Sequence, residues 1–128
     1  MPYCYKVIDG VNFLSWDMAH LKCKLMKSDL LSFHNIKERE WINSKIQENR
    51  EYYINLHHYL YGTDWRMANG TSPSEVCLVW AGPGPDDYWE LEDCAHFWRS
   101  DRQTFLNDYP CTVAHPQVTS YICKIPKC

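Results

Sequence analysis

The residues whose chemistry is most evident lie between Trp80 and Cys111, where seven carboxylates occur within 32 residues of a chain with a net charge of −3. Carboxylates at this density repel one another unless a cation, a basic partner or open water neutralises them. Oxygen donors of the kind that Ca²⁺ prefers come in two groups, Asp86 with Glu92 and Asn107 with Asp108. A cysteine follows each group, and a bridge between Cys94 and Cys111 would bring the groups together. Composition alone leaves two interpretations open, a cation site and a solvated acidic loop.

The order of these residues resembles the calcium and sugar site of C-type lectin domains. In that family a Trp precedes a Glu-Pro-Asn or Gln-Pro-Asp triplet by four residues, and Glu-Asp-Cys and Trp-Asn-Asp follow. The corresponding residues here are Trp80, Gly84-Pro85-Asp86, Glu92-Asp93-Cys94 and Leu106-Asn107-Asp108. Two positions depart from the pattern. Gly84 lacks the side-chain oxygen of one expected ligand, and Leu106 replaces a Trp of the core.

The resemblance implies a site for one calcium ion, at which a sugar also binds. The ion would be held by Asp86, Glu92, Asn107 and Asp108, with Pro85 in the cis form beside it. Family members whose triplet ends in Pro-Asp tend to bind galactose, so a ligand of galactose or GalNAc type is expected. One face of galactose carries C–H groups that stack on an aromatic ring, a role that falls to Trp89 or to Tyr88. The implied sugar-binding residues are Asp86, Trp89, Glu92, Asn107 and Asp108.

A second function remains open, that of a C-type-lectin-like domain that binds a protein partner without calcium. The loss of a ligand at Gly84 favours this alternative, whereas the four retained ligands favour the lectin. Catalysis is not expected, because the sequence has no nucleophile elbow, no His-Glu-x-x-His and no phosphate-cradling loop. The adjacent pair His57-His58 is not expected to bind a metal, because neighbouring residues of a strand point to opposite faces.

The composition indicates one folded domain, residues 1–128, with an extracellular location. Apolar residues make up 45% and aromatic residues 15% of the chain, and no apolar run is long enough to span a membrane. Seven cysteines, none of them in a Cys-x-x-Cys pair, favour a disulfide framework and therefore secretion. No leader-like segment precedes Tyr3, so either a signal peptide was removed or the protein is cytosolic. The balanced charge gives no basic surface for nucleic acid.

The spacing of apolar residues predicts an α+β fold, and the resemblance specifies it as two helices on small antiparallel sheets with a long loop region. A first helix is expected from an N-cap at Ser15 to about Lys27, with Trp16, Ala19, Cys23 and Met26 facing the core. A capping box at Asn35 and Glu38 opens a second helix through Gln47, whose many charges are expected to form a solvated face. Strands are expected over residues 3–8, 52–56 and 119–125, and around Trp65 before a turn at Asn69-Gly70.

The resemblance also implies a disulfide pattern, Cys23–Cys123 and Cys94–Cys111. Because the first and last strands are neighbours in this fold, Cys4–Cys128 is the natural third bridge. Cys77 is then left over, and two interpretations stay open: a disulfide that links two chains in a homodimer, and a free or capped thiol. Asn69 begins an Asn-Gly-Thr sequon, so it is a candidate glycosylation site that should lie at the surface.

Overall fold

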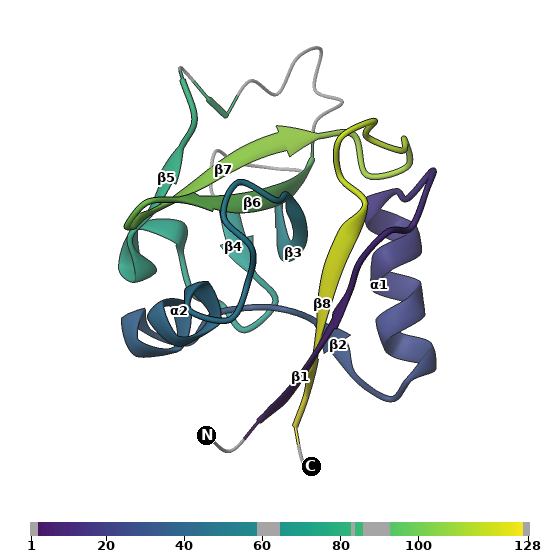
Figure 1. Cartoon of the computed structure of the whole chain (residues 1–128), viewed down its shortest axis with the longest axis horizontal. Helices are drawn as coiled ribbons and strands as arrows, with labels where there is room; N and C mark the ends of the chain where they lie inside the picture. The colour runs from purple at the N-terminus through teal and green to yellow at the C-terminus, as the bar shows by residue number, and fades with distance from the viewer. Residues whose placement is uncertain (1–2, 59–64, 83, 86–92, 127–128) are drawn as a thin grey trace.

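The computed structural model describes residues 3–58, 65–82, 84–85 and 93–126. Two α-helices and a mixed β-sheet form an α+β fold, as predicted (Figure 1). In chain order the elements are β1 (Cys4–Ile8), α1 (Trp16–Leu25), β2 (Asp29–Leu30), α2 (Ile36–Asn43), β3 (Tyr52–His58), β4 (Trp65–Met67), the 3₁₀-helix η1 (Pro73–Val76), β5 (Leu78–Trp80), β6 (Cys94–Ser100), β7 (Gln103–Tyr109) and β8 (Ser120–Ile125).

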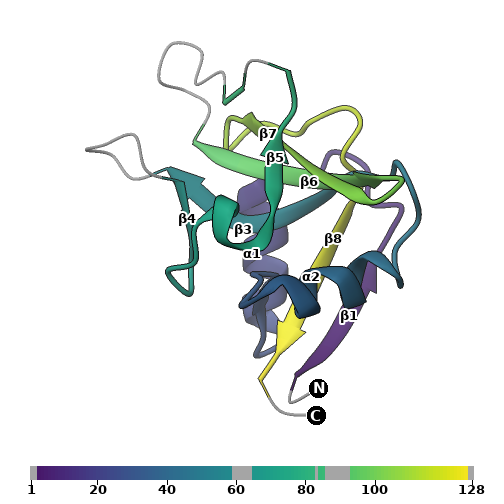
Figure 2. The ribbon, with the colours of Figure 1, turned by 90° about the vertical axis from the view of Figure 1, so that its left-hand side faces the viewer.

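The strands pair in the order β1-β8-β3-β6-β7-β5, with β2 added to β8 and β4 added to β3. The pairs β3–β8 and β5–β7 are parallel, so the sheet is mixed rather than purely antiparallel. Because β1 pairs antiparallel with β8, the two ends of the chain lie side by side. The two views together place α1 and α2 on opposite sides of β8 (Figure 2).

Local capping explains where both helices begin. Ser15 Oγ accepts a hydrogen bond from the Met18 N–H (3.2 Å), and Asn35 Oδ1 accepts one from the Glu38 N–H (2.9 Å). Both helices end earlier than predicted. Helix α1 stops at Leu25, so Met26 is its C-cap and is exposed instead of facing the core. Helix α2 stops at Asn43, and the chain continues in turns that still bury Ile46.

The central strand β3 is buried on both of its faces and divides the core into two clusters. Tyr52, Ile54 and Leu56 belong to one cluster, which also contains Leu106. Tyr53 belongs to the other, together with the disulfide cysteines of α1, β6 and β8. This separation follows from the alternation of side chains along a strand. No helix of the described residues is long and apolar enough to cross a membrane.

The prediction that the charges of α2 form a solvated face is wrong for two of them. Glu38 and Arg39 are 4% and 7% exposed. Charged side chains are buried at this level only when partners compensate them. Glu38 has such partners on three elements, whereas Arg39 is less completely compensated.

Glu38 is the centre of a buried network that ties α2 to the first and last strands, β1 and β8. Its carboxylate lies 2.7 Å from Lys124 Nζ of β8 and accepts hydrogen bonds from the Tyr5 hydroxyl of β1 and the His34 N–H. Lys124 also donates to the Ser32 carbonyl (3.0 Å). Burial by itself raises the pKa of Glu38, but the hydrogen bonds from Lys124, Tyr5 and His34 outweigh it, so this pKa lies below its ordinary value.

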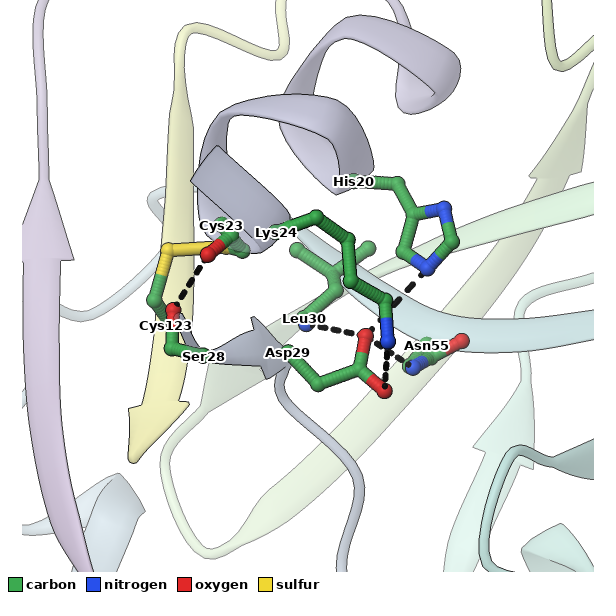
Figure 3. Close-up of a disulfide and its surroundings, with 8 residues drawn as sticks. All are labelled: His20, Cys23, Lys24, Ser28, Asp29, Leu30, Asn55 and Cys123. Carbon is green, nitrogen blue, oxygen red and sulfur yellow. Dashed lines mark hydrogen bonds and ion pairs between the residues drawn. A yellow bond between two sulfur atoms is a disulfide. The ribbon is translucent and has the colours of Figure 1, made fainter. Parts of the chain in front are cut away.

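Helix α1 is attached to the sheet through a disulfide and a carboxylate (Figure 3). Cys23 of α1 is bonded to Cys123 of β8, and Ser28 Oγ donates to the Cys23 carbonyl at 2.7 Å. Asp29 of β2 lies 3.2 Å from both His20 Nε2 and Lys24 Nζ of α1, and it accepts a hydrogen bond from Asn55 Nδ2 of β3. Three elements therefore meet at one carboxylate.

Candidate functional site

Three strands bring the segments of the predicted calcium site toward one another. Strand β7 lies between β5 and β6, with Trp80 opposite Leu106 and Ala95 opposite Asp108 (Figure 1). Beyond the end of β5, the Ala81 N–H donates to the Leu106 carbonyl at 2.8 Å, and the Gly84 N–H donates to the Ala81 carbonyl at 3.2 Å. The segment that carries Gly84 is therefore tied to β7 just before its two predicted ligands.

The described part of the motif has a definite conformation. The Gly84–Pro85 peptide bond is cis. A Cβ added to Gly84 would lie 3.0 Å from the Ala81 carbonyl oxygen and 3.7 Å from the Trp80 Cβ, so the backbone approaches its neighbours closely here. Leu106, at the position of the family's core Trp, is fully buried, and Trp80 packs against its cluster.

Asn107 and Asp108 leave opposite faces of β7, as the alternation of a strand requires. Asp108 is 1% exposed and lies on the face shared with Ala95 and Leu106. Asn107 lies on the other face, opposite His96 of β6. The resemblance placed both side chains in one ligand set, whereas the described strand does not gather them on one face.

The other predicted site residues, Asp86, Trp89 and Glu92, lie outside the described residues. Within residues 3–58, 65–82, 84–85 and 93–126, no three His, Cys, Asp or Glu side chains come close enough to hold a metal ion. The donor chemistry of the full predicted set still suits Ca²⁺, because it consists of three carboxylates and one amide. Asp86 directly follows Pro85 and Glu92 directly precedes Asp93, so both flank segments that the structure places beside β7.

The face of β7 that carries Asn107 borders a polar cavity of about 290 Å³. Nearby, His96 of β6 is 1% exposed, and its Nε2 lies 2.9 Å from Glu51 Oε1. The His115 ring packs on the rings of His96 (4.9 Å) and Tyr109 (4.4 Å). Burial, together with His96, lowers the pKa of His115 below its ordinary value. The cavity lining consists of Asn49, Glu51, Trp98, Asn107, His115 and Gln117.

This polar cluster was not predicted from the sequence. Its strand members could have been recognised, because His96 and Trp98 are two residues apart on a strand and so share a face. The contribution of Glu51 and His115 could not, because they come from two loops far apart in the sequence, one before β3 and one before β8. His57 packs edge-on against Trp16 and His58 stacks on Trp65, which places the two imidazoles in different surroundings.

The cysteine pattern agrees with the one that the resemblance implies wherever it is described. The bonds Cys23–Cys123 and Cys94–Cys111 are present. Cys4 is disulfide-bonded, and its expected partner, Cys128, lies outside the described residues. Cys77 is exposed and carries a free thiol. Asn69 is exposed in the turn after β4, where its Nδ2 donates to the Phe33 carbonyl (3.1 Å).

Comparison with known sequences gives a consistent family. Residues 12–125 match the family described as the Lectin C-type domain. The chain is 28% identical to human C-type lectin domain family 4 member E over 77% of its own length, and 26% identical to the Hepatic lectin of Gallus gallus over 88%. It spans 45% and 51% of these two relatives, which is about half of each.

Solved structures show the same fold at lower identity. The C-type lectin CEL-I from Cucumaria echinata superposes with a TM-score of 0.74 at 22% identity, covering 98% of this chain and 91% of that one. A calcium-independent type II antifreeze protein superposes with a TM-score of 0.70 at 20% identity, covering 97% and 86%. The fold is therefore shared by a protein described as a C-type lectin and by one described as calcium-independent.

Proposed function

The chain belongs to the C-type lectin domain family, and on that premise we propose that it is a calcium-dependent carbohydrate-binding domain, of galactose or GalNAc type. The observation that supports the proposal is the pairing of three strands: β7, which carries Asp108, lies between β5 and β6, Pro85 follows the end of β5, and Asp93 directly precedes β6. Asp86 and Glu92 adjoin Pro85 and Asp93, respectively, in the sequence. On this proposal the four oxygen donors come from three chain segments that flank or form β7.

Asp86, Glu92, Asn107 and Asp108 would hold the calcium ion. Bound Ca²⁺ would supply a coordination point for two adjacent hydroxyls of a sugar. The protein groups then act on those hydroxyls directly: carboxylates accept their hydrogen bonds, and the amide of Asn107 donates to them. Gly84 leaves one position without a side-chain ligand, so calcium affinity is expected to be low, with a dissociation constant of about 10⁻⁴–10⁻³ M as in other extracellular modules.

The galactose preference is proposed from Asp86 and Trp89. The Pro85-Asp86 pair matches the family pattern that accompanies galactose, and an aromatic ring at Trp89 would stack on the C–H face of that sugar. The proposed partners are therefore galactose-bearing glycans or a glycoprotein, in an extracellular setting consistent with the disulfides. Binding, not catalysis, is the proposed activity. Asn69 is proposed as a glycan acceptor, because its sequon is exposed.

A calcium-independent protein-binding domain is the second candidate. Two features of this chain favour it: Gly84 offers no side-chain oxygen, and Asn107 and Asp108 leave opposite faces of β7. A solved relative of the same fold is described as calcium-independent. The two candidates differ in one respect that can be measured directly, the need for calcium.

Substitution of single ligands tests the lectin proposal. Asp108→Asn and Glu92→Gln should each lower calcium affinity by at least about tenfold, because each removes one negative charge from the ligand set. Asp101→Asn is the matched control, since this exposed carboxylate lies at the β6–β7 turn and should leave calcium affinity unchanged. Because Asp108 is buried, Asp108→Asn alone would not separate the loss of a ligand from a disturbed fold. Glu92→Gln therefore tests the ligand set at a second position. Equal affinity in all three variants would contradict the assignment of the ligands.

We also propose that Cys77 links two copies of the chain. The thiol is exposed at the C-terminal end of η1, just before β5. The oxidised protein is then expected to migrate as a dimer on non-reducing electrophoresis and as a monomer after reduction, with Cys77→Ser monomeric in both. A protein that migrates only as a monomer without reductant would rule this linkage out.

A further inference from the structure

A second polar cavity lies far from the proposed calcium site, between the end of α2 and the turn that joins β6 to β7. Its volume is about 410 Å³. The β6–β7 turn and Asp108 are at opposite ends of β7, roughly 20 Å apart at the rise of a β-strand. The two figures agree that this turn lies beside α2. The lining residues are Arg39, Glu40, Asn43, Ser44, Arg99, Asp101 and Arg102.

Arg39 supplies this cavity with a buried and poorly compensated positive charge. The residue is 7% exposed, yet its guanidinium donates only to Thr104 Oγ1, at 3.3 Å. The nearest carboxylate oxygen, Glu40 Oε1, is 3.9 Å from Nη2, and Glu40 is itself mostly exposed. Arg39 Nε is buried without a hydrogen-bond partner in the described part of the chain. A buried guanidinium with five N–H donors and one hydrogen bond lacks an anionic acceptor.

The other lining residues strengthen the case for an anion. Arg99 donates from Nε and Nη2 to the Ile46 carbonyl, and its Nη1 is 3.9 Å from Glu48 Oε2, so no carboxylate binds it bidentately. Arg102 is exposed on the turn. Three arginines against Glu40 and Asp101 leave the lining net positive in a chain that is negative overall. Planar guanidinium forks are suited to carboxylate and sulfate groups.

Asn43 indicates that the ligand carries a hydrogen-bond donor in addition to an oxyanion. Its Nδ2 donates to Thr104 Oγ1 at 2.6 Å, whereas its Oδ1 is buried without a partner among the residues described. Among the residues that the structure describes, Arg39 Nε thus lacks an acceptor and Asn43 Oδ1 lacks a donor, and both residues line the cavity. A ligand that carries both an oxyanion and a hydroxyl group would satisfy both residues.

We propose that this cavity, the arginine pocket, binds the carboxylate or sulfate of a hydroxylated small ligand, such as an acidic sugar, without any need for calcium. Arg39 and Arg102 contact the oxyanion, and Asn43 accepts a hydrogen bond from a neighbouring hydroxyl. A cavity of this volume lies within the range of small-molecule sites and exceeds the size of a single inorganic anion.

The pocket is tested by titrating the oxidised chain in buffer freed of calcium with a chelating resin and held at constant ionic strength, with NMR signals of the arginine Nε–H groups and the backbone amides as the readout. Sodium sulfate, glucuronic acid and neutral galactose are the three probes. We expect saturable shifts of Arg39, Asn43 and Arg99 with the two anions, tighter binding of glucuronic acid than of sulfate, and no shift with galactose. Arg39→Gln should weaken glucuronic acid binding by about tenfold or more, since it removes a charge-assisted hydrogen bond.

Two further variants keep the test decisive. Arg102→Gln is exposed and should fold normally, and it should weaken binding severalfold. Lys37→Gln removes an exposed cation of α2 that does not line the pocket, and it should leave binding unchanged. Non-saturable shifts, or an equal loss of glucuronic acid affinity in Lys37→Gln and Arg102→Gln, would contradict the proposal that the arginine pocket binds an anion. Sulfate binding as tight as that of glucuronic acid would contradict the proposal that the ligand carries a hydroxyl group. Because calcium is absent throughout, none of these outcomes depends on the lectin site.

Discussion

Lys124→Met is expected to lower the free energy of unfolding by about 3–5 kcal/mol at pH 7, the usual cost of removing one partner of a buried ion pair. The substitution leaves the Glu38 carboxylate inside the protein with hydrogen bonds but without its cation. Lys6→Met is the matched control, because Lys6 lies exposed on the neighbouring strand β1, and it should change stability by less than about 0.5 kcal/mol. Urea denaturation followed by circular dichroism measures both.

The pH dependence of this effect has a definite sign. The pKa of Glu38 is lower in the folded protein than in the unfolded chain, so its contribution is complete above the unfolded pKa and is lost as pH falls through the folded one. The difference between wild type and Lys124→Met should therefore shrink below about pH 4. A difference that stays constant from pH 7 into the acid range would contradict this account of the network.

Loss of the Cys23–Cys123 disulfide should have an effect of similar size. The bond spans 100 residues of sequence, and on the chain-entropy model a loop of that length contributes about 4–5 kcal/mol. The double variant Cys23→Ser/Cys123→Ser should lose this amount, a large fraction of the 5–15 kcal/mol that is typical of a domain. It also leaves two hydroxyls in a fully buried part of the core. Guanidinium denaturation of the purified variant measures the loss.

Cys77→Ser is the natural control for the disulfide, because that cysteine is exposed and unbonded. Its unfolding free energy per chain should match that of the oxidised wild-type protein to within about 0.5 kcal/mol. If the double variant were no less stable than Cys77→Ser, the long bridge would not be holding α1 to β8.

The elements that depend on local chemistry could be predicted from the sequence. Ser15 and Asn35 cap the two helices because their side chains reach backbone N–H groups three residues ahead, and this pattern is readable without any tertiary knowledge. The buried strand at Tyr52 was recognisable from its β-branched and aromatic residues. The choice of parallel partners for β3 and β5 was not, because it joins segments far apart in the sequence.

The charges of α2 show why solvent exposure was harder to predict than secondary structure. Glu38 is buried because Lys124 and Tyr5 reach it from strands at the two ends of the chain. Nothing near α2 in the sequence indicates that contact. Arg39 is buried against Thr104 of β7 for the same kind of reason. The position of the helix was therefore predicted from the sequence, but the prediction of which of its charged side chains face water was wrong for Glu38 and Arg39.

The candidate site and the arginine pocket likewise differ in how much of each could be predicted from the sequence. Spacing and resemblance predicted roles for Pro85, Asn107 and Asp108; Pro85 follows the end of β5, and Asn107 and Asp108 lie on β7. The opposite directions of Asn107 and Asp108 could have been foreseen from strand alternation alone. The arginine pocket could not, because α2 and the β6–β7 turn meet only in the folded chain.

The central claim is calcium-dependent binding of a galactose-type sugar, and calorimetric titration tests it most directly. The oxidised protein is titrated with CaCl₂ alone, and then in the presence of galactose or of mannose. The account predicts saturable calcium binding in the range of about 10⁻⁴–10⁻³ M that galactose tightens and mannose does not. Absence of calcium binding at millimolar concentrations would contradict it and would leave the calcium-independent, protein-binding domain as the function to pursue.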